Sequence, residues 1–144
     1  MGKVSIIYWS GTGNTEAMAA AIAEGAKDAG AEVELLTVDK AEAAALSEAK
    51  AFALGCPAMG AEELEEGEME PFMAELDSQI AGKTVALFGS YGWGGGEWMR
   101  DWESRVVSDG AAVLSGEGII ADNAPDDDVL AECRAAGAKL AALV

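Results

Sequence analysis

The segment most suited to binding chemistry is a six-residue loop of glycines and uncharged hydrogen-bond donors. It directly follows the first strand-like apolar run and consists of Ser10, Gly11, Thr12, Gly13, Asn14 and Thr15. Glycines let a backbone fold closely around an anion, and free N–H groups at a helix start attract negative charge. No Lys follows the second glycine, as a Walker loop requires, and Glu16 stands where a dinucleotide fingerprint has Gly or Ala. The pattern indicates a cradle for a phosphate monoester; an ordinary glycine-containing turn with a Thr cap is the alternative.

Two further loops carry residues that could hold a flat aromatic ring. The first reads GCPAMGAEE over residues 55–63, and the second reads GSYGWGGGEW over residues 89–98. Trp93 offers a face for stacking, and the thioether of Met59 is a polarisable partner for the opposite face. In the alternative reading both side chains fill gaps in the core, but a tryptophan flanked by glycines is poorly held for that purpose.

The composition excludes several kinds of chemistry. The chain has two cysteines, Cys56 and Cys133, and no histidine, so an ordinary zinc site, an iron–sulfur centre and a Ser-His or Cys-His pair are excluded. Both thiols are expected to be reduced structural residues. Demanding chemistry must then come from a bound cofactor.

The charge is strongly negative, with nine basic residues against 26 acidic ones and a net charge of −17. Nucleic acid and anionic membranes are poor partners for such a chain. The acidity provides solubility or, alternatively, steers the protein toward basic faces of partner proteins. We expect a cytoplasmic protein, because neither a signal-peptide pattern nor an apolar run long enough to cross a bilayer is present.

Alternating strand-like runs and helix-length segments must position the three loops. The strand-like runs are Val4–Trp9, Val33–Val38, Ala51–Leu54, Thr84–Phe88 and Ala112–Ile120. The helix-like segments are Thr15–Ala29, the Ala-rich Ala41–Ala49, Glu70–Ile80, Glu97–Ser108 and Asp126–Val144.

This alternation predicts a single α/β domain over residues 1–144, with a five-stranded parallel sheet covered by helices on both faces. The letters SGEG at residues 115–118 indicate a bulge or break in the fifth strand. Ligands of such sheets bind beyond the C-terminal ends of the strands, which is where all three loops are expected.

Three motifs in order, SGTGNTE, GCPAMG and FGSYGWGGGEWM, resemble the short-chain flavodoxins of clostridia and other anaerobic bacteria. The resemblance runs through nearly the whole chain. It implies a flavodoxin-like doubly wound sheet with strand order 2-1-3-4-5 and a non-covalently bound FMN. It also implies a low-potential one-electron carrier rather than an enzyme, cycling mainly between semiquinone and hydroquinone. The expected partners are redox proteins with basic docking faces, and a monomer is expected because the flavin edge must stay free.

The resemblance also implies a role for each loop. Residues 10–15 would bind the phosphate, Met59 and Trp93 would pack on the two faces of the ring, and Glu62 would accept a hydrogen bond from flavin N3. Backbone groups of the 89–92 segment would meet the polar edge of the ring. The candidate FMN-binding residues are Ser10, Gly11, Thr12, Gly13, Asn14, Thr15, Ala58, Met59, Gly60, Ala61, Glu62, Gly89, Ser90, Tyr91, Gly92, Trp93 and Gly94.

A run of glutamates follows the expected ring site: Glu62, Glu63, Glu65, Glu66, Glu68 and Glu70. Negative charge and an apolar sandwich both disfavour an anionic hydroquinone, so we expect a strongly reducing second couple. The alternative is a solvated helix start that is acidic for dipole reasons.

Two other functions are open. A quinone reductase of related fold would need a substrate cavity beside the ring, usually shaped by inserted loops or a second subunit, and this chain has no such insertion. A module that binds a phosphorylated ligand would have no need of Trp93 and Met59.

Ala61 generates a first prediction. Many members of the resembled family have a small polar residue here, and the peptide after Gly60 reorients on reduction. A type II turn would put positive φ on a residue that is less comfortable as Ala than as Gly. A penalty on the order of 1 kcal/mol corresponds to roughly 40 mV. We predict that Ala61→Gly raises the oxidised/semiquinone potential by roughly that amount in a redox titration; an unchanged or lowered potential would contradict this.

Overall fold

The computed structural model describes residues 2–60 and 62–144, so the candidate Ala61 lies outside the described residues. The strands are β1 (Lys3–Tyr8), β2 (Glu32–Thr37), β3 (Ala51–Gly55), β4 (Thr84–Tyr91), β5 (Ala112–Val113) and β6 (Ile119–Asp122). The α-helices are α1 (Asn14–Asp28), α2 (Met69–Leu76), α3 (Glu97–Ser108) and α4 (Asp127–Ala141). Within the described part of the chain, no helix has the length and apolar character needed to span a membrane.

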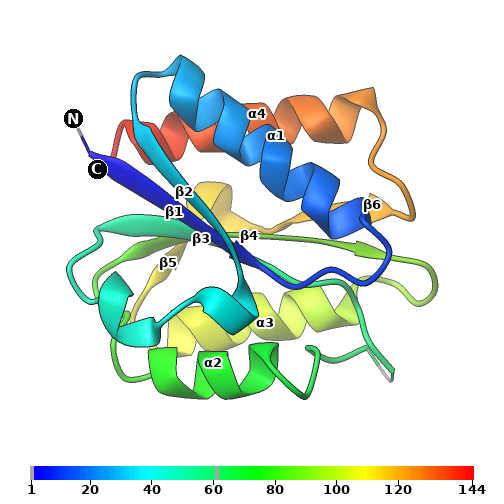
Figure 1. Ribbon diagram of the computed structural model, residues 1–144. Helices are drawn as coiled ribbons and strands as arrows, with labels where there is room; N and C mark the ends of the chain where they lie inside the picture. Colours follow the sequence, from blue (N-terminus) through cyan, green and yellow to red (C-terminus); the bar gives the residue numbers. More distant parts are fainter. Residues whose placement is uncertain (1, 61) are drawn as a thin grey trace.

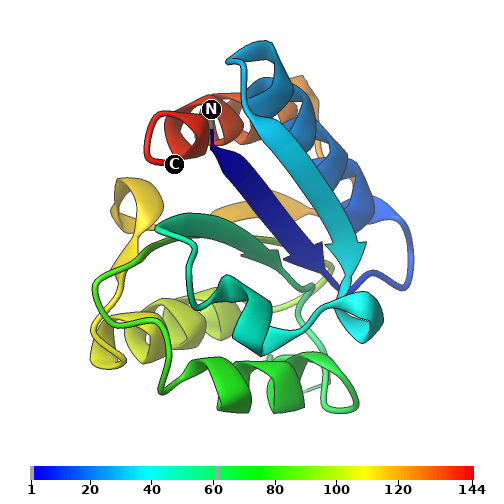
Figure 2. The ribbon, with the colours of Figure 1, turned by 60° about the vertical axis from the view of Figure 1, so that its left-hand side comes forward.

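All strand pairings are parallel, and the sheet order is β2-β1-β3-β4-β5, with β6 also paired to β4. This confirms the predicted parallel sheet and the order 2-1-3-4-5. Helices α1 and α4 cover one face of the sheet, and α2 and α3 cover the other (Figure 1). The turned view shows the same two layers with the sheet between them (Figure 2). The prediction of helices on both faces is therefore confirmed.

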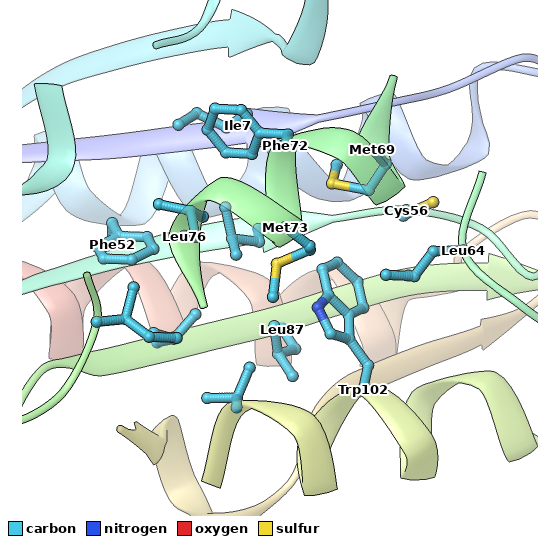
Figure 3. Packing of buried hydrophobic residues seen from close by; sticks show 14 of the residues in the cluster. Ile7, Phe52, Cys56, Leu64, Met69, Phe72, Met73, Leu76, Leu87 and Trp102 are labelled. Atoms are coloured by element: carbon cyan, nitrogen blue, oxygen red, sulfur yellow. The ribbon is translucent and has the colours of Figure 1, made fainter. Parts of the chain in front are cut away.

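Apolar side chains fill both spaces between sheet and helices. On the α2 and α3 side, Phe52 and Leu87 from the sheet meet Met73 and Trp102 from the helices, and all four are buried (Figure 3). Full burial of a side chain of this size contributes about 1.5–3 kcal/mol. This core holds the strands in register up to their C-terminal ends, where the candidate loops begin.

On the other face, α1 and α4 pack backbone against backbone through two glycines. A Cβ on Gly25 would lie 1.9 Å from the carbonyl oxygen of Arg134, and one on Gly137 would lie 2.0 Å from that of Ile22. No side chain fits at either position. The close contact fixes α1, whose first turn follows the candidate phosphate loop.

The predicted α-helix Ala41–Ala49 is wrong. The chain instead forms two short 3₁₀ helices, Val38–Lys40 and Ala43–Leu46. Helices shorter than about 12 residues need tertiary packing to be stable. Within Ala43–Leu46 only the first and last residues are buried. Little packing therefore stabilises this segment, and the helix propensity of alanine alone is too weak to form an α-helix here. Helix α2 also ends four residues before the predicted Ile80, although Ile80 is buried.

The predicted interruption of the fifth strand is confirmed. A 3₁₀ turn, Leu114–Gly116, separates β5 from β6, and Ser115 and Gly116 have φ values of 62° and 85°. These left-handed residues redirect the chain so that both segments lie beside β4. The second segment, β6, runs two residues past the predicted end at Ile120.

A carboxyl pair lies where α2 and α3 end. Arg105 donates to Asp77, with Nε–Oδ1 and Nη2–Oδ2 distances of 3.0 and 2.8 Å. Burial alone would raise the pKa of Asp77, but these hydrogen bonds hold it below its ordinary value. Burial, followed by the hydrogen-bonding and charge effects of the neighbouring Asp77 carboxyl, raises the pKa of Asp109 from 3.8 to about 6.

Asp109 makes the free energy of unfolding depend on pH. Folding raises its pKa, so the stability it contributes is present at low pH and is lost as the pH rises through about 6. We predict that Asp109→Asn is more stable than the wild type at pH 7.5 and that the difference shrinks toward pH 4. Urea denaturation over this range measures it. Asp101→Asn, at an exposed position of α3, is the control and should show no such trend. Equal stability of Asp109→Asn and wild type at pH 7.5 would contradict the prediction.

Candidate functional site

A cavity of about 400 Å³ lies at the C-terminal edge of the sheet, where the three predicted loops meet. It is open to solvent and bounded by the ends of β1, β3, β4 and β6. Its lining residues are Trp9, Gly11, Thr12, Asn14, Pro57, Ala58, Met59, Ser90, Tyr91, Gly92, Trp93 and Asn123. Nine of the sequence-predicted residues are therefore brought together around one space.

The phosphate loop is organised by its own hydroxyl groups. Ser10 Oγ accepts from the Gly13 amide at 3.1 Å, and Thr12 Oγ1 accepts from the Asn14 amide at 3.4 Å. Gly13 is the N-cap of α1, with φ of 94°, a conformation that favours glycine. Ser10 and Gly13 thus shape the loop without lining the cavity.

Helix α1 differs from the other three α-helices at its N-terminus. Glu65 Oε1 accepts from the Met69 amide of α2 at 3.0 Å, Glu62 Oε1 accepts from the Glu97 amide of α3 at 2.9 Å, and Asp126 Oδ1 accepts from the Val129 amide of α4 at 2.9 Å. No carboxylate among the described residues does this for α1. The Asn14 amide meets the neighbouring Thr12 hydroxyl, but the next two amides of the first turn have no partner among the described residues and could bind an external anion.

Thr15 ties the start of α1 to the C-terminal end of β4. Its Oγ1 lies 3.3 Å from Ser90 Oγ and accepts from the Ser90 amide at 3.4 Å. Both residues are buried, and only Ser90 lines the cavity. The Thr15 side chain therefore points into the protein and holds these two elements together.

Met59 and Trp93 both line the cavity, as predicted for the residues on either side of a ring. Trp93 is 57% exposed, so it is not a core plug. Met59 is half-buried, and its backbone exchanges two hydrogen bonds of 2.9 Å with Glu63, which closes the turn between them. A large exposed indole and a half-buried thioether lining the same cavity are suited to a flat ligand.

Two glycines that were predicted to bind FMN, Gly89 and Gly94, lie against other protein atoms. A Cβ on Gly89 would lie 2.1 Å from the Cys56 carbonyl oxygen, so this glycine allows β4 to pack against the end of β3. A Cβ on Gly94 would lie 2.5 Å from Glu62 Cδ, and Gly94 has φ of 78°. Neither residue lines the cavity, and neither does Gly60.

Glu62 joins the two ring-side loops. Its Oε1 accepts from the Gly96 and Glu97 amides at 3.2 and 2.9 Å. Its own φ is 57°, a left-handed conformation that costs roughly 1 kcal/mol for a residue with a side chain. The two hydrogen bonds to α3 offset that strain. Glu62 does not line the cavity, so its expected contact with flavin N3 stays a prediction.

Most of the glutamate run is engaged in hydrogen bonds. The Glu65 carboxylate accepts from three amides at the start of α2; burial alone would raise its pKa, but these bonds hold it below the ordinary value. Glu68 Oε1 accepts from the Trp9 indole at 3.2 Å, and Glu70 pairs with Arg105 at 2.8 Å. Glu63 and Glu66 have no side-chain hydrogen bond or ion pair to the described residues. The run is therefore not a uniformly solvated face.

Three lining residues were missed by the sequence reasoning: Trp9, Pro57 and Asn123. Trp9 directly precedes the SGTGNTE motif, and Pro57 lies within GCPAMG, so both were within reach of the motifs but were not singled out. Asn123 follows β6, with φ of 61°, and its amide donates to the Tyr91 carbonyl at 2.7 Å. The rule that ligands lie beyond strand C-termini pointed there, but the strand was predicted to end earlier.

Comparison with known proteins gives the family. The flavodoxin family profile matches residues 6–137. The chain belongs to the flavodoxin family. A flavodoxin of Megasphaera elsdenii is 48% identical over 135 residues, which are 92% of this chain and 98% of the relative. A flavodoxin of Clostridium beijerinckii is 48% identical over 124 residues, 86% of this chain and 89% of the relative.

Solved structures similar to this chain also include flavodoxins. The solution structure of two-electron reduced Megasphaera elsdenii flavodoxin has a TM-score of 0.85 at 46% identity, over 96% of this chain and 99% of that one. A flavodoxin from the domain Archaea has a TM-score of 0.85 at 30% identity. As a flavodoxin, the chain is an FMN-binding electron carrier, as the resemblance implied. The residues present fit this cofactor, since the cavity is lined both by Thr12 and Asn14 at the start of α1 and by the exposed indole of Trp93.

The Glu62 contacts generate a prediction about the apoprotein. Glu62→Ala removes the carboxylate from the start of α3 and should lower the free energy of unfolding by about 1 kcal/mol. Amide exchange at Gly96 and Glu97 should become faster. Glu63→Ala is the matched control, because it removes a neighbouring charge without a hydrogen-bond partner in the described structure. Identical effects of the two variants on stability and exchange would show that the contact is unimportant.

Proposed function

We propose that this flavodoxin is a low-potential one-electron carrier that cycles mainly between the semiquinone and hydroquinone forms of FMN. The observation that carries the proposal is the cavity itself, whose lining combines uncharged polar residues suited to a phosphate, Thr12 and Asn14, with Met59 and the exposed Trp93. FMN supplies the electron chemistry. The protein binds its phosphate, orients its ring and keeps one side of the site open to partners.

The charge distribution supports an acidic docking face. The loops after β1, β3, β4 and β6 carry one acidic residue in 9–16, six in 56–70, one in 90–97 and four in 122–128, and none of these four carries Lys or Arg. Lys40 follows the outer strand β2. Three other lysines stand at the opposite edge, where Lys3 begins β1 and Lys50 and Lys83 directly precede β3 and β4. Such asymmetry orients an approaching partner whose own face is basic. We propose that redox partners present such faces around their electron-transfer sites.

The remaining proposals concern the state of the protein. We propose that it acts as a monomer, because a second copy over the exposed Trp93 would cover the site. We place it in the cytoplasm, because Cys56 and Cys133 are both free, as expected in a reducing compartment.

The experiment that tests the proposal is reduction of the FMN-loaded protein in steps. The apoprotein should take up one FMN per chain, and reduction should pass through a stable neutral one-electron form with long-wavelength absorbance. The protein alone should not sustain NAD(P)H-dependent quinone reduction. A colourless protein that takes up no added FMN, or sustained quinone turnover, would overturn the proposal.

The glutamate run allows a test of the low second potential without loss of structural contacts. Glu63 and Glu66 are the members without a side-chain partner among the described residues, so their charge can be removed while the fold is kept. Glu63→Gln with Glu66→Gln should raise the semiquinone/hydroquinone potential by on the order of 10–20 mV per charge at low salt, as for charges about 10 Å apart in water. The shift should shrink at high salt. Spectroelectrochemistry measures it, and an unchanged potential at low salt would refute the electrostatic account.

A further inference from the structure

Trp9 lies on the phosphate loop that follows it. A Cβ on Gly11 would lie 3.2 and 3.3 Å from two carbons of the indole ring, Cη2 and Cζ3, so the ring covers the backbone at this point of the loop. Trp9 is half-buried and lines the cavity together with Gly11. A phosphate loop rich in glycine has few conformational restraints of its own, so a ring packed on it restricts its movement.

The indole is itself held by the segment that precedes α2. Its N–H donates to Glu68 Oε1 at 3.2 Å across 59 positions of sequence. Glu68 directly precedes α2, and its amide donates to Glu65 Oε1 at 2.7 Å. Glu65 in turn accepts from the first amide of α2. A chain of hydrogen bonds thus runs from the phosphate loop's covering ring to the start of α2.

We propose that the Trp9–Glu68 hydrogen bond positions the phosphate loop, so that Trp9 and Glu68 act as positioning residues for the phosphate end of FMN. The inference rests on the proposed function, since it concerns the same cofactor. The link acts on the 10–15 loop and on neither ring-side residue, Met59 nor Trp93. Its loss should therefore weaken binding of FMN more than binding of riboflavin, which has the same ring and no phosphate.

A purely electrostatic effect of Glu68 would change the preference for FMN over riboflavin in the opposite direction. The positioning role and the charge effect can therefore be distinguished. Glu68 is an anion close to the loop that would hold a phosphate dianion, so removing its charge alone should favour FMN over riboflavin. Glu68→Gln removes the charge but keeps an oxygen that can accept from the indole. Glu68→Ala removes both. The positioning role predicts that only the Ala variant loses preference for FMN.

The experiment measures the dissociation constants of FMN and riboflavin for apoprotein prepared from each variant. In Trp9→Phe and Glu68→Ala, the preference for FMN over riboflavin should fall about 3- to 10-fold, as for loss of one hydrogen bond. Glu68→Gln should not lose preference. Glu66→Ala is the matched control, an exposed glutamate of the same segment without a side-chain partner among the described residues, and should not lose preference either.

The double variant gives the decisive comparison. Because both single changes remove one interaction, Trp9→Phe with Glu68→Ala should lose no more preference than Trp9→Phe alone. Three results would each overturn the inference. The losses of preference in the two single variants could simply add in the double variant, affinity for FMN and for riboflavin could fall equally, or Glu68→Ala could behave like Glu66→Ala. Wild-type apoprotein that binds neither ligand would instead overturn the proposed function.

Discussion

The structure depends on one electrostatic constraint: a protein of net charge −17 must hold a phosphate group without a basic residue beside it. Backbone amides at the start of α1 would meet this constraint, since such amides attract an anion through fixed dipoles and add no charge of their own. These amides can bind an anion only if the helix that carries them is held in place. The glycine contacts with α4 and the buried Thr15–Ser90 pair provide that support.

The glutamates near the site affect which helix starts can bind an anion. The amides at the starts of α2 and α3 would attract an anion if they were free. Glu65 and Glu62 occupy them with carboxylates from the same chain. Among the α-helix starts of the described structure, only that of α1 has no carboxylate on its amides. The acidic run would therefore leave this start for the phosphate.

The sequence was most informative where function depends on neighbouring residues. The SGTGNTE loop and the Met59 and Trp93 segments could be identified because strand, loop and helix follow one another directly. The strand order came from resemblance, since periodicity does not define which strands are neighbours. Roles that depend on distant partners were not predictable: nothing local shows that Gly89 faces the Cys56 carbonyl or that Gly94 faces Glu62. The Ala41–Ala49 helix failed because propensity was judged without knowing what the segment packs on.

Trp93 combines the two properties of the site, an exposed apolar surface and negative charge nearby. An indole that is 57% exposed would ordinarily invite non-specific association, yet the loop that carries it contacts Glu62 of the glutamate run. Like charges would keep two copies of this face apart, while a basic partner would be drawn toward it over about a Debye length, 8–10 Å at moderate salt. Closer in, the removal of water from apolar surface would matter more than charge, and a partner would meet the exposed indole. Long-range charge would thus select the partner, and the short-range apolar contact would bring its redox centre near the ring.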